Sequence, residues 1–95
     1  MDKLSDQQRD EALERLSDWQ AQGEAITRTF QLRDFGRAID FVNAVAEMAE
    51  DANHHPDIDI RYNKVTITLT THSAGGLTRH DIELAAGIDA IAGAA

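Results

Sequence analysis

The sequence predicts an α+β fold, a four-stranded antiparallel sheet with three helices packed on one face, in the order α-β-β-α-β-β-α. Two patterns predict it. Apolar residues recur at helical spacing in residues 35–52 and 79–95, whereas they alternate with polar residues in 25–32, 58–62 and 65–70. A chain of 95 residues suffices for one domain, which we expect to span residues 1–95.

Two capping signals place the first two helices. Ser5 and Gln8 have the spacing of a capping box, which predicts a helix that begins there and ends before Gly23. Asp34 is the expected N-cap of a second helix, FGRAIDFVNAVAEMAEDA (35–52). We expect its apolar residues to form a broad buried stripe, which comprises Phe35, Ala38, Ile39, Val42, Val45, Ala46 and Ala49, widened by Phe41 and Met48.

The segment AITRTFQL (25–32) alternates as a strand, and the chain around Trp19 is a candidate hairpin partner. Arg28 interrupts its apolar face, either by extending its charged end to solvent or by facing a site. The opposite face of the predicted sheet is rich in threonine.

Residues 58–70 predict a second hairpin. A two-residue loop at Asn63–Lys64 is expected because Asn tolerates a positive φ. This loop would give three apolar cross-strand pairs, Tyr62 with Val65, Ile60 with Ile67, and Ile58 with Leu69. The same register, extended beyond them, would place Pro56 opposite Thr71 and His55 opposite His72.

The last helix is expected over residues 79–95. Thr78 and Asp81 have the spacing of a second capping box, with Asp in place of Glu, so we expect Asp81 to cap the helix rather than act as a catalyst. His80 is expected to be solvated. Gly87 costs about 1 kcal/mol of helix propensity relative to Ala, which close approach of another helix would offset.

Charge and composition exclude several classes of function. The net charge of −8, from 9 basic and 17 acidic residues without a basic cluster, argues against direct binding of nucleic acid. The absence of cysteine excludes disulfides and thiolate zinc sites. The chain has no apolar signal core and no run approaching 18 apolar residues, so we expect a cytoplasmic protein without a membrane span.

Histidines mark the candidate site in the stretch EDANHHPDIDIRYN. The predicted register gathers His54, His55 and His72 at one end of the hairpin, and Glu50 lies one helical turn before His54, where it could orient that ring. The ordinary pKa of imidazole, about 6.5, suits a reaction that removes one proton and protonates a leaving group. On spacing alone, histidines that merely cap the helix or lie on a solvated strand end are an equal alternative.

A metal site built from the three histidines and Glu50 is the other chemical alternative. Adjacent residues on an extended segment point to opposite sides, so His54 and His55 would not easily bind one ion. We therefore expect no metal.

The chain resembles the pterin-4a-carbinolamine dehydratases, also known as dimerisation cofactors of a homeodomain transcription factor. The resemblance covers about residues 19–91 and includes RTFQLRDFGRAIDF, AEDANHHP, YNKVTITLTTH and GGLTRHDIELA. Its most specific part is a spaced motif, which reads Glu50, three residues, His54-His55-Pro56, five residues, Tyr62, nine residues, His72, eight residues and Asp81. The family usually has Gly before its tryptophan, whereas Asp18 precedes Trp19 here.

The resemblance implies a dehydratase that converts 4a-hydroxytetrahydropterin to quinonoid dihydropterin and water, in the recycling that serves aromatic amino-acid hydroxylases. It implies His54 and His72 as the acid–base pair, with His55 holding the substrate and Glu50 and Asp81 as supporting residues. The implied pterin pocket is lined by Asn53, His54, His55, Thr70, Thr71, His72 and Ser73. No metal or organic cofactor is implied, because the N5 lone pair assists departure of the hydroxyl.

The competing class is a non-catalytic interaction module or transcriptional coactivator of the same fold, and the complete histidine set favours the enzyme. Members of the family are dimers or tetramers. The Ala/Gly-rich last helix and an open sheet edge at residues 25–32 or their hairpin partner also predict a homo-oligomer. In that helix, Leu84, Ile88 and Ile91 would pack on the sheet, while Ala85 and Ala86 would allow another helix to approach.

Overall fold

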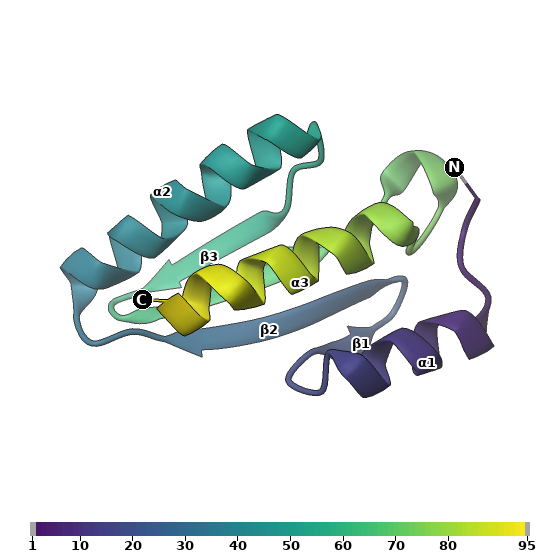
Figure 1. The fold of residues 1–95 in the computed structure, drawn as a ribbon, viewed down its shortest axis with the longest axis horizontal. Coiled ribbons are helices and arrows are strands. Elements are labelled where there is room, and N and C mark those ends of the chain that lie inside the picture. Colours follow the sequence, from purple (N-terminus) through teal and green to yellow (C-terminus); the bar gives the residue numbers. More distant parts are fainter. Residues whose placement is uncertain (1, 95) are drawn as a thin grey trace.

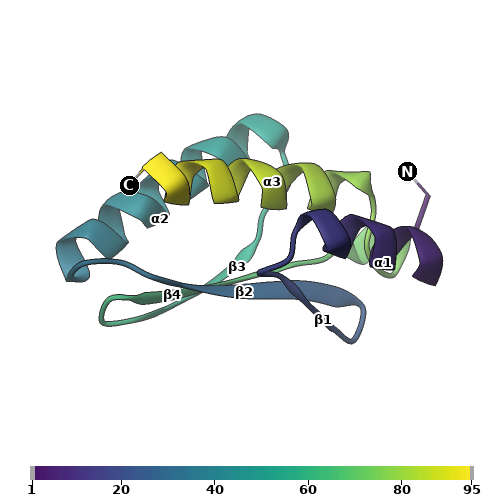
Figure 2. The same ribbon diagram turned by 60° about the horizontal axis from the view of Figure 1, so that its bottom comes forward.

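The computed structural model describes residues 2–94 and contains three α-helices and one four-stranded antiparallel sheet. The strands lie in the order β1-β2-β4-β3, and the helices cover one face of the sheet (Figures 1 and 2). The predicted fold class is confirmed. In chain order the elements are α1 (Asp6–Arg15), β1 (Gln20–Gln22), β2 (Ala25–Gln31), α2 (Phe35–Ala52), β3 (Asp57–Arg61), β4 (Lys64–Leu69), the 3₁₀ turn η1 (His72–Ala74) and α3 (Arg79–Ala94).

The predicted caps of α1 and α2 are confirmed. Ser5 Oγ accepts from the Gln8 N–H at 3.1 Å and Gln8 Oε1 accepts from the Ser5 N–H at 2.8 Å, which completes the capping box. Asp34 Oδ1 accepts from the Arg37 N–H at 2.8 Å. Both helices therefore begin where short polar side chains bind otherwise unpaired N–H groups.

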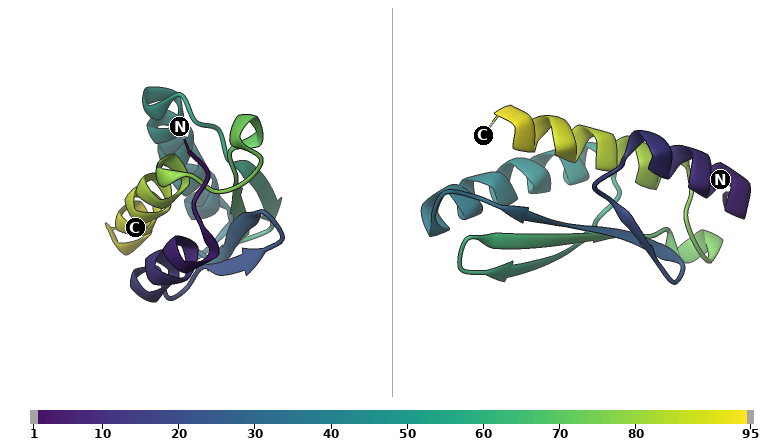
Figure 3. Two further views of the ribbon diagram at one scale, coloured as in Figure 1. Left: turned by 90° about the vertical axis from the view of Figure 1, so that its right-hand side faces the viewer. Right: turned by 90° about the horizontal axis from the view of Figure 1, so that it is seen from below.

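The helices lie over one face of the sheet, as the end-on view in Figure 3 shows, and the core residues come from both layers. On α2 the buried stripe is Ala38, Phe41, Val45 and Ala49, whereas Phe35 is about half exposed and Ala46 is exposed. Two residues of the predicted stripe, Phe35 and Ala46, thus face solvent. The other core residues are Leu16, Trp19, Ile26, Phe30, Val65, Ile67, Leu69, Leu77, Leu84, Ala85 and Ile88.

Arg28, on the inner face of β2, forms part of a polar cluster at the edge of this core. Its Nη1 lies 2.7 Å from Asp89 Oδ1 on α3, and its guanidinium carbon lies 4.2 Å from the centre of the Phe30 ring. Trp19 is buried and donates from Nε1 to the same Asp89 oxygen at 2.8 Å. Arg28 on β2 and Trp19, which precedes β1, therefore both bind the same residue of α3.

The predicted loop of the second hairpin is wrong by one residue. The turn is Tyr62–Asn63, because Arg61 pairs with Lys64, Ile60 with Val65 and Ile58 with Ile67. Tyr62 adopts the positive φ of 52°, while Asn63 is bound to the end of β2: its Nδ2 donates to Leu32 O and its own carbonyl accepts from Leu32 N, each at 2.8 Å. A contact with a third strand thus selects the turn.

The partners of Ile58 and Ile60 lie two residues from the predicted ones, which keeps these side chains on the predicted face, whereas Tyr62 lies in the turn and is 69% exposed. The helix-free face does carry threonines, with Thr29 Oγ1 2.8 Å from Thr66 Oγ1 and Thr27 Oγ1 3.3 Å from Thr68 Oγ1. Alternation of apolar and polar residues could not distinguish the two registers, because both place apolar residues opposite one another.

The helices α2 and α3 approach closely at Gly87, as expected from the position of this residue in a helix. A Cβ atom built there would lie 2.6 Å from Met48 Sδ. Of the other small residues on α3, Ala85 is fully buried, whereas Ala86 is exposed. The prediction that Ala85 offers an outer surface is therefore wrong.

Candidate active site

The candidate site lies where the end of α2, the beginning of α3 and the turn η1 meet, at the right of Figure 1. Asn53 ends α2 in the left-handed conformation, with φ 49° and ψ 43°, and the His54 N–H donates to Ala49 O at 3.1 Å. Asn adopts this conformation more readily than most residues. The turn at Asn53 redirects the chain, and it determines which way the two histidines face.

His54 faces α3 and forms a short contact with a buried carboxylate. Its Nε2 lies 2.5 Å from Asp81 Oδ1, and the two side chains are 13% and 0% exposed. Asp81 Oδ2 accepts from Thr71 Oγ1 at 2.7 Å and from the Thr78 N–H at 2.9 Å. Both carboxylate oxygens are thus bound, so Asp81 holds the imidazole while it also caps α3.

His55 forms a second pair, with Glu50 at the end of α2. His55 Nε2 lies 2.6 Å from Glu50 Oε1, and the two side chains are 59% and 75% exposed. The prediction that Glu50 orients His54 is therefore wrong. Spacing of four residues brings side chains together only within a helix, and the left-handed Asn53 interrupts the helix before His54.

The turn η1 carries His72, and it replaces the predicted extension of the hairpin. Strand β4 ends at Leu69 and β3 begins at Asp57, so the predicted pairing of His55 with His72 and of Pro56 with Thr71 is wrong. Thr71 instead pairs with Gly76 across a tight loop, which leaves the His72 side chain exposed. Among the predicted residues, Thr71 is the one whose side chain joins the His54–Asp81 pair.

The remaining predicted pocket residues surround this cluster without binding to it. Thr70 donates from Oγ1 to Glu24 O at 2.7 Å, and the side chains of Asn53 and Ser73 are exposed. Trp19 lies in the core beside Asp89. Residues 2–94 contain no group of three or more His, Asp or Glu side chains arranged to hold a metal ion.

Two contributors were underestimated from the sequence. Thr78 is fully buried, and its hydroxyl lies 2.9 Å from Thr71 Oγ1, within the cluster around Asp81. His80 is exposed as predicted, but the centre of its ring lies 5.8 Å from that of His54. The Thr78–Asp81 capping signal indicated the helix start, whereas nothing in the spacing indicated that the cap would hold a histidine.

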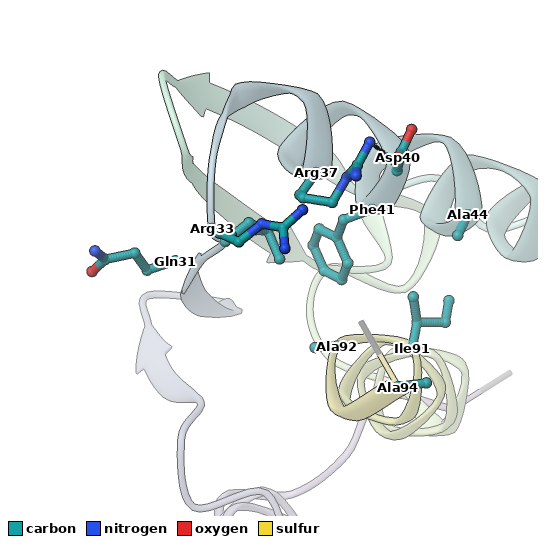
Figure 4. A pocket seen from close by; sticks show the side chains of 10 residues that line it. Gln31, Arg33, Arg37, Asp40, Phe41, Ala44, Ile91, Ala92 and Ala94 are labelled. Atoms are coloured by element: carbon teal, nitrogen blue, oxygen red, sulfur yellow. Dashed lines mark ion pairs between the residues drawn. The ribbon is translucent and has the colours of Figure 1, made fainter.

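A hollow of about 620 Å³ lies at the opposite end of the molecule, between the first half of α2 and the end of α3 (Figure 4). Phe41 and Ile91 point into it, and Arg33, Arg37 and Asp40 stand at its rim. No histidine lines this hollow, so we do not assign the predicted chemistry to it. In the described part of the chain, no helix is long and apolar enough to cross a membrane.

Comparison with known proteins adds independent information. Residues 2–91 match the family model described as pterin 4 alpha carbinolamine dehydratase. A protein of Nocardia farcinica named "Putative pterin-4-alpha-carbinolamine dehydratase" is 57% identical over 89 residues, which cover 94% of each chain. A protein of the same name from Chloroflexus aurantiacus is 54% identical over 93 residues, covering 98% of this chain and 100% of its own.

Solved structures agree with these sequence matches. A transcriptional coactivator/pterin dehydratase from Brucella melitensis superposes with a TM-score of 0.93 at 42% identity, covering 96% of this chain and 99% of its own. A pterin dehydratase-like protein described as a RuBisCO assembly factor in the alpha-carboxysome gives a TM-score of 0.65 at 26% identity, covering 79% and 87%. The chain belongs to the pterin-4a-carbinolamine dehydratase family.

Proposed function

We propose that the protein dehydrates 4a-hydroxytetrahydropterin to quinonoid dihydropterin by histidine acid–base catalysis, in the recycling of the pterin used by aromatic amino-acid hydroxylases. The observation that carries the proposal is the contact of 2.5 Å between His54 Nε2 and the buried Asp81. A positioned imidazole beside a carboxylate can take up a proton and be stabilised as its cation. Membership of the family supplies the substrate class.

The reaction requires one proton donor and one proton acceptor. The leaving 4a hydroxyl takes a proton and departs as water, the N5 lone pair forms the C4a=N5 bond, and N5 then loses its proton. Protons and electrons balance without a redox partner. We assign the two proton transfers to His54 and His72, since His54 has a fixed carboxylate partner and His72 lies on the adjoining exposed turn.

The exposed side chains around this pair are assigned to the substrate. His55 would hold the pterin, with Glu50 fixing the His55 ring at 2.6 Å. The pocket would be completed by Asn53, Thr70, Thr71 and Ser73. Ser73, Asn53 and His55 offer the hydroxyl, amide and imidazole hydrogen bonds that a polar heterocycle needs. The proposed reaction uses no metal and no organic cofactor.

Homo-oligomerisation, as a dimer or tetramer, is a further part of the proposal. Strand β2 pairs on both sides, so the prediction of an open edge at residues 25–32 is wrong; the edges are its hairpin partner β1 and strand β3, whose Ile60 is 37% exposed. On α3, Ala86, Ala90 and Gly93 form an exposed row of small residues at helical spacing. Pairing of a sheet edge or packing of such a row would cover these surfaces. Sedimentation equilibrium at micromolar concentration tests this, and a single 10.5 kDa species would contradict it.

The decisive experiment is an assay of carbinolamine dehydration with freshly generated 4a-hydroxytetrahydropterin, compared with the uncatalysed rate and with the His54→Ala/His72→Ala double variant. We expect acceleration by the wild-type chain and little or none by the double variant. A wild-type rate equal to the uncatalysed rate would favour the alternative, a non-catalytic interaction module or transcriptional coactivator of the same fold. We expect a cytoplasmic location for this activity.

A further inference from the structure

Two polar side chains of the described chain are completely buried, and both belong to the cluster behind His54. Thr78 and Asp81 are each 0% exposed. Burial of polar groups is costly unless each finds a hydrogen-bonding partner, and every buried side-chain nitrogen or oxygen within residues 2–94 has one. Because every hydrogen-bonding atom in this cluster has a partner, the positions of its hydrogens can be worked out. They bear on which nitrogen of His54 carries the proton.

The number of available hydrogens determines which atom is the donor in each hydrogen bond of this cluster. Thr71 has one hydroxyl hydrogen, and it donates that hydrogen to Asp81 Oδ2 at 2.7 Å. The contact of 2.9 Å between the Thr71 and Thr78 hydroxyls must then be a bond donated by Thr78. The Thr78 oxygen in turn accepts from the His80 N–H at 3.2 Å. The chain of donors therefore runs from the first turn of α3 through both threonines to Asp81.

The direction continues from Asp81 to His54. An ionised carboxylate only accepts hydrogen bonds, so its Oδ1 requires a hydrogen on His54 Nε2, 2.5 Å away. In a neutral imidazole the other nitrogen is then unprotonated. His54 Nδ1 has no hydrogen-bonding partner within residues 2–94. Every buried side-chain nitrogen or oxygen in these residues does have a partner, so Nδ1 cannot be buried and is open to solvent or substrate.

We propose that Thr71 and Thr78 are positioning residues that hold Asp81 and thereby fix His54 in the Nε2–H tautomer, so that His54 exchanges its proton with the substrate through Nδ1. The inference rests on the proposed acid–base role of His54 and adds the reacting atom and the groups that select it. In the transfer Nδ1 gains or returns one proton, and Asp81 faces the imidazolium cation while it exists. Because the Thr71 hydroxyl donates to Asp81, only the methyl group and backbone of Thr71 would contact the substrate.

The test uses Thr71→Val, which keeps the shape of the side chain without its hydroxyl, and Thr71→Ser, which restores the hydroxyl. Thr66→Val is the matched control, because it removes a threonine pair of 2.8 Å on the helix-free sheet face. The ring ¹⁵N shifts of His54 are measured near pH 9, where an ordinary imidazole is neutral. They report the tautomer without depending on activity.

We expect the Nε2–H tautomer to dominate in the wild type, in Thr66→Val and in Thr71→Ser. Its share should fall in Thr71→Val, because Asp81 Oδ2 loses one of its two donors and the carboxylate is held less firmly against His54. The kcat for dehydration should fall roughly 10-fold in Thr71→Val with KM little changed, the size expected for one hydrogen bond to a charged group, and Ser should rescue it. A wild-type Nδ1–H tautomer, or a Thr71→Val variant with unchanged tautomer and kcat, would overturn the inference.

A second variant keeps the test decisive if Thr71→Val fails to fold. Asp81→Asn retains an oxygen for Thr71 and Thr78 but offers an N–H₂ to His54, so the tautomer should invert to Nδ1–H. Retention of Nε2–H in Asp81→Asn would contradict the inference. Shifts that follow these expectations in a chain without dehydratase activity would support the positioning of His54 and contradict the proposed function instead.

Discussion

Two adjacent histidines each face a carboxylate, and their surroundings differ. The His54–Asp81 pair is nearly enclosed, with side chains 13% and 0% exposed, and Asp81 is bound by three donors. The His55–Glu50 pair is open to solvent, at 59% and 75%. Exposed pairs contribute little, whereas a buried charge depends on every partner it has. The two His–carboxylate contacts have similar lengths, but we infer that His54 is held in one orientation whereas His55 is free to adapt to a ligand.

The largest expected difference between the two pairs is in catalysis. Replacing His54 by Ala should lower kcat by about 10²–10⁴-fold, the usual contribution of a positioned general acid or base. Replacing His55 by Ala should raise KM by roughly 10-fold, as for one lost hydrogen bond, and change kcat less. Steady-state kinetics of both variants measures this. Near-wild-type kcat in the His54 variant, or equal losses in both, would show that the enclosed pair has no special role.

The second largest expected difference is in the free energy of unfolding when each carboxylate is removed. Asp81→Ala leaves the Thr71 hydroxyl, the Thr78 N–H and His54 without their acceptor, so the free energy of unfolding should fall by roughly 3–5 kcal/mol. Glu50→Ala removes an exposed partner and should cost at most about 1 kcal/mol. Urea unfolding followed by circular dichroism gives both values. Similar losses in the two variants would contradict the difference in burial.

A smaller effect concerns salt. At 1 M ionic strength charges are screened beyond about 3 Å, and exposed pairs are affected far more than buried ones. At pH 5.5, where an ordinary imidazole is mostly protonated, the stability loss of Glu50→Ala should disappear between low salt and 1 M NaCl. The loss of Asp81→Ala should persist, and parallel salt dependences would indicate that both pairs are equally solvated.

Removal of metal should have no effect at all. His54 and His55 face different carboxylates, and residues 2–94 contain no group of three or more His, Asp or Glu side chains that could hold an ion. Dialysis of active protein against a strong chelator should leave its rate unchanged. Stoichiometric zinc that is lost together with activity, and that restores activity when returned, would reverse the assignment.

The sequence predicted the helices, the strands and their faces because these depend on short-range signals. The capping box at Ser5 and the cap at Asp34 lie where expected, since a cap binds N–H groups two or three residues away. Alternation placed Val65, Ile67 and Leu69 inside and the threonines between them outside, which any register shifted by two residues preserves. Helix caps and strand alternation were confirmed, whereas the local spacings that predicted the Asn63–Lys64 loop and the Glu50–His54 contact were wrong.

The hairpin register and the carboxylate partners of the histidines depended on contacts and backbone geometry that spacing did not indicate. The binding of Asn63 to Leu32 selected the hairpin turn, and the left-handed Asn53 exchanged the expected carboxylate partners of the histidines. The spaced motif contains His54, His55, Glu50 and Asp81, which form the two His–carboxylate pairs, but it contained no information on which side chain faces which. That choice depends on the direction in which the chain leaves α2, which the left-handed Asn53 sets.

The sequence by itself therefore determined the fold class and most of the buried faces, because periodicity and caps are local properties of the chain. Only the tertiary structure decided that Asp81, 27 residues from His54 in the chain, is its partner. The packing of α3 against the end of α2 buries the carboxylate, and burial requires that every hydrogen-bonding position on it be filled. The direction of those bonds, and with it the tautomer of His54, is consequently set by the packing of the helices.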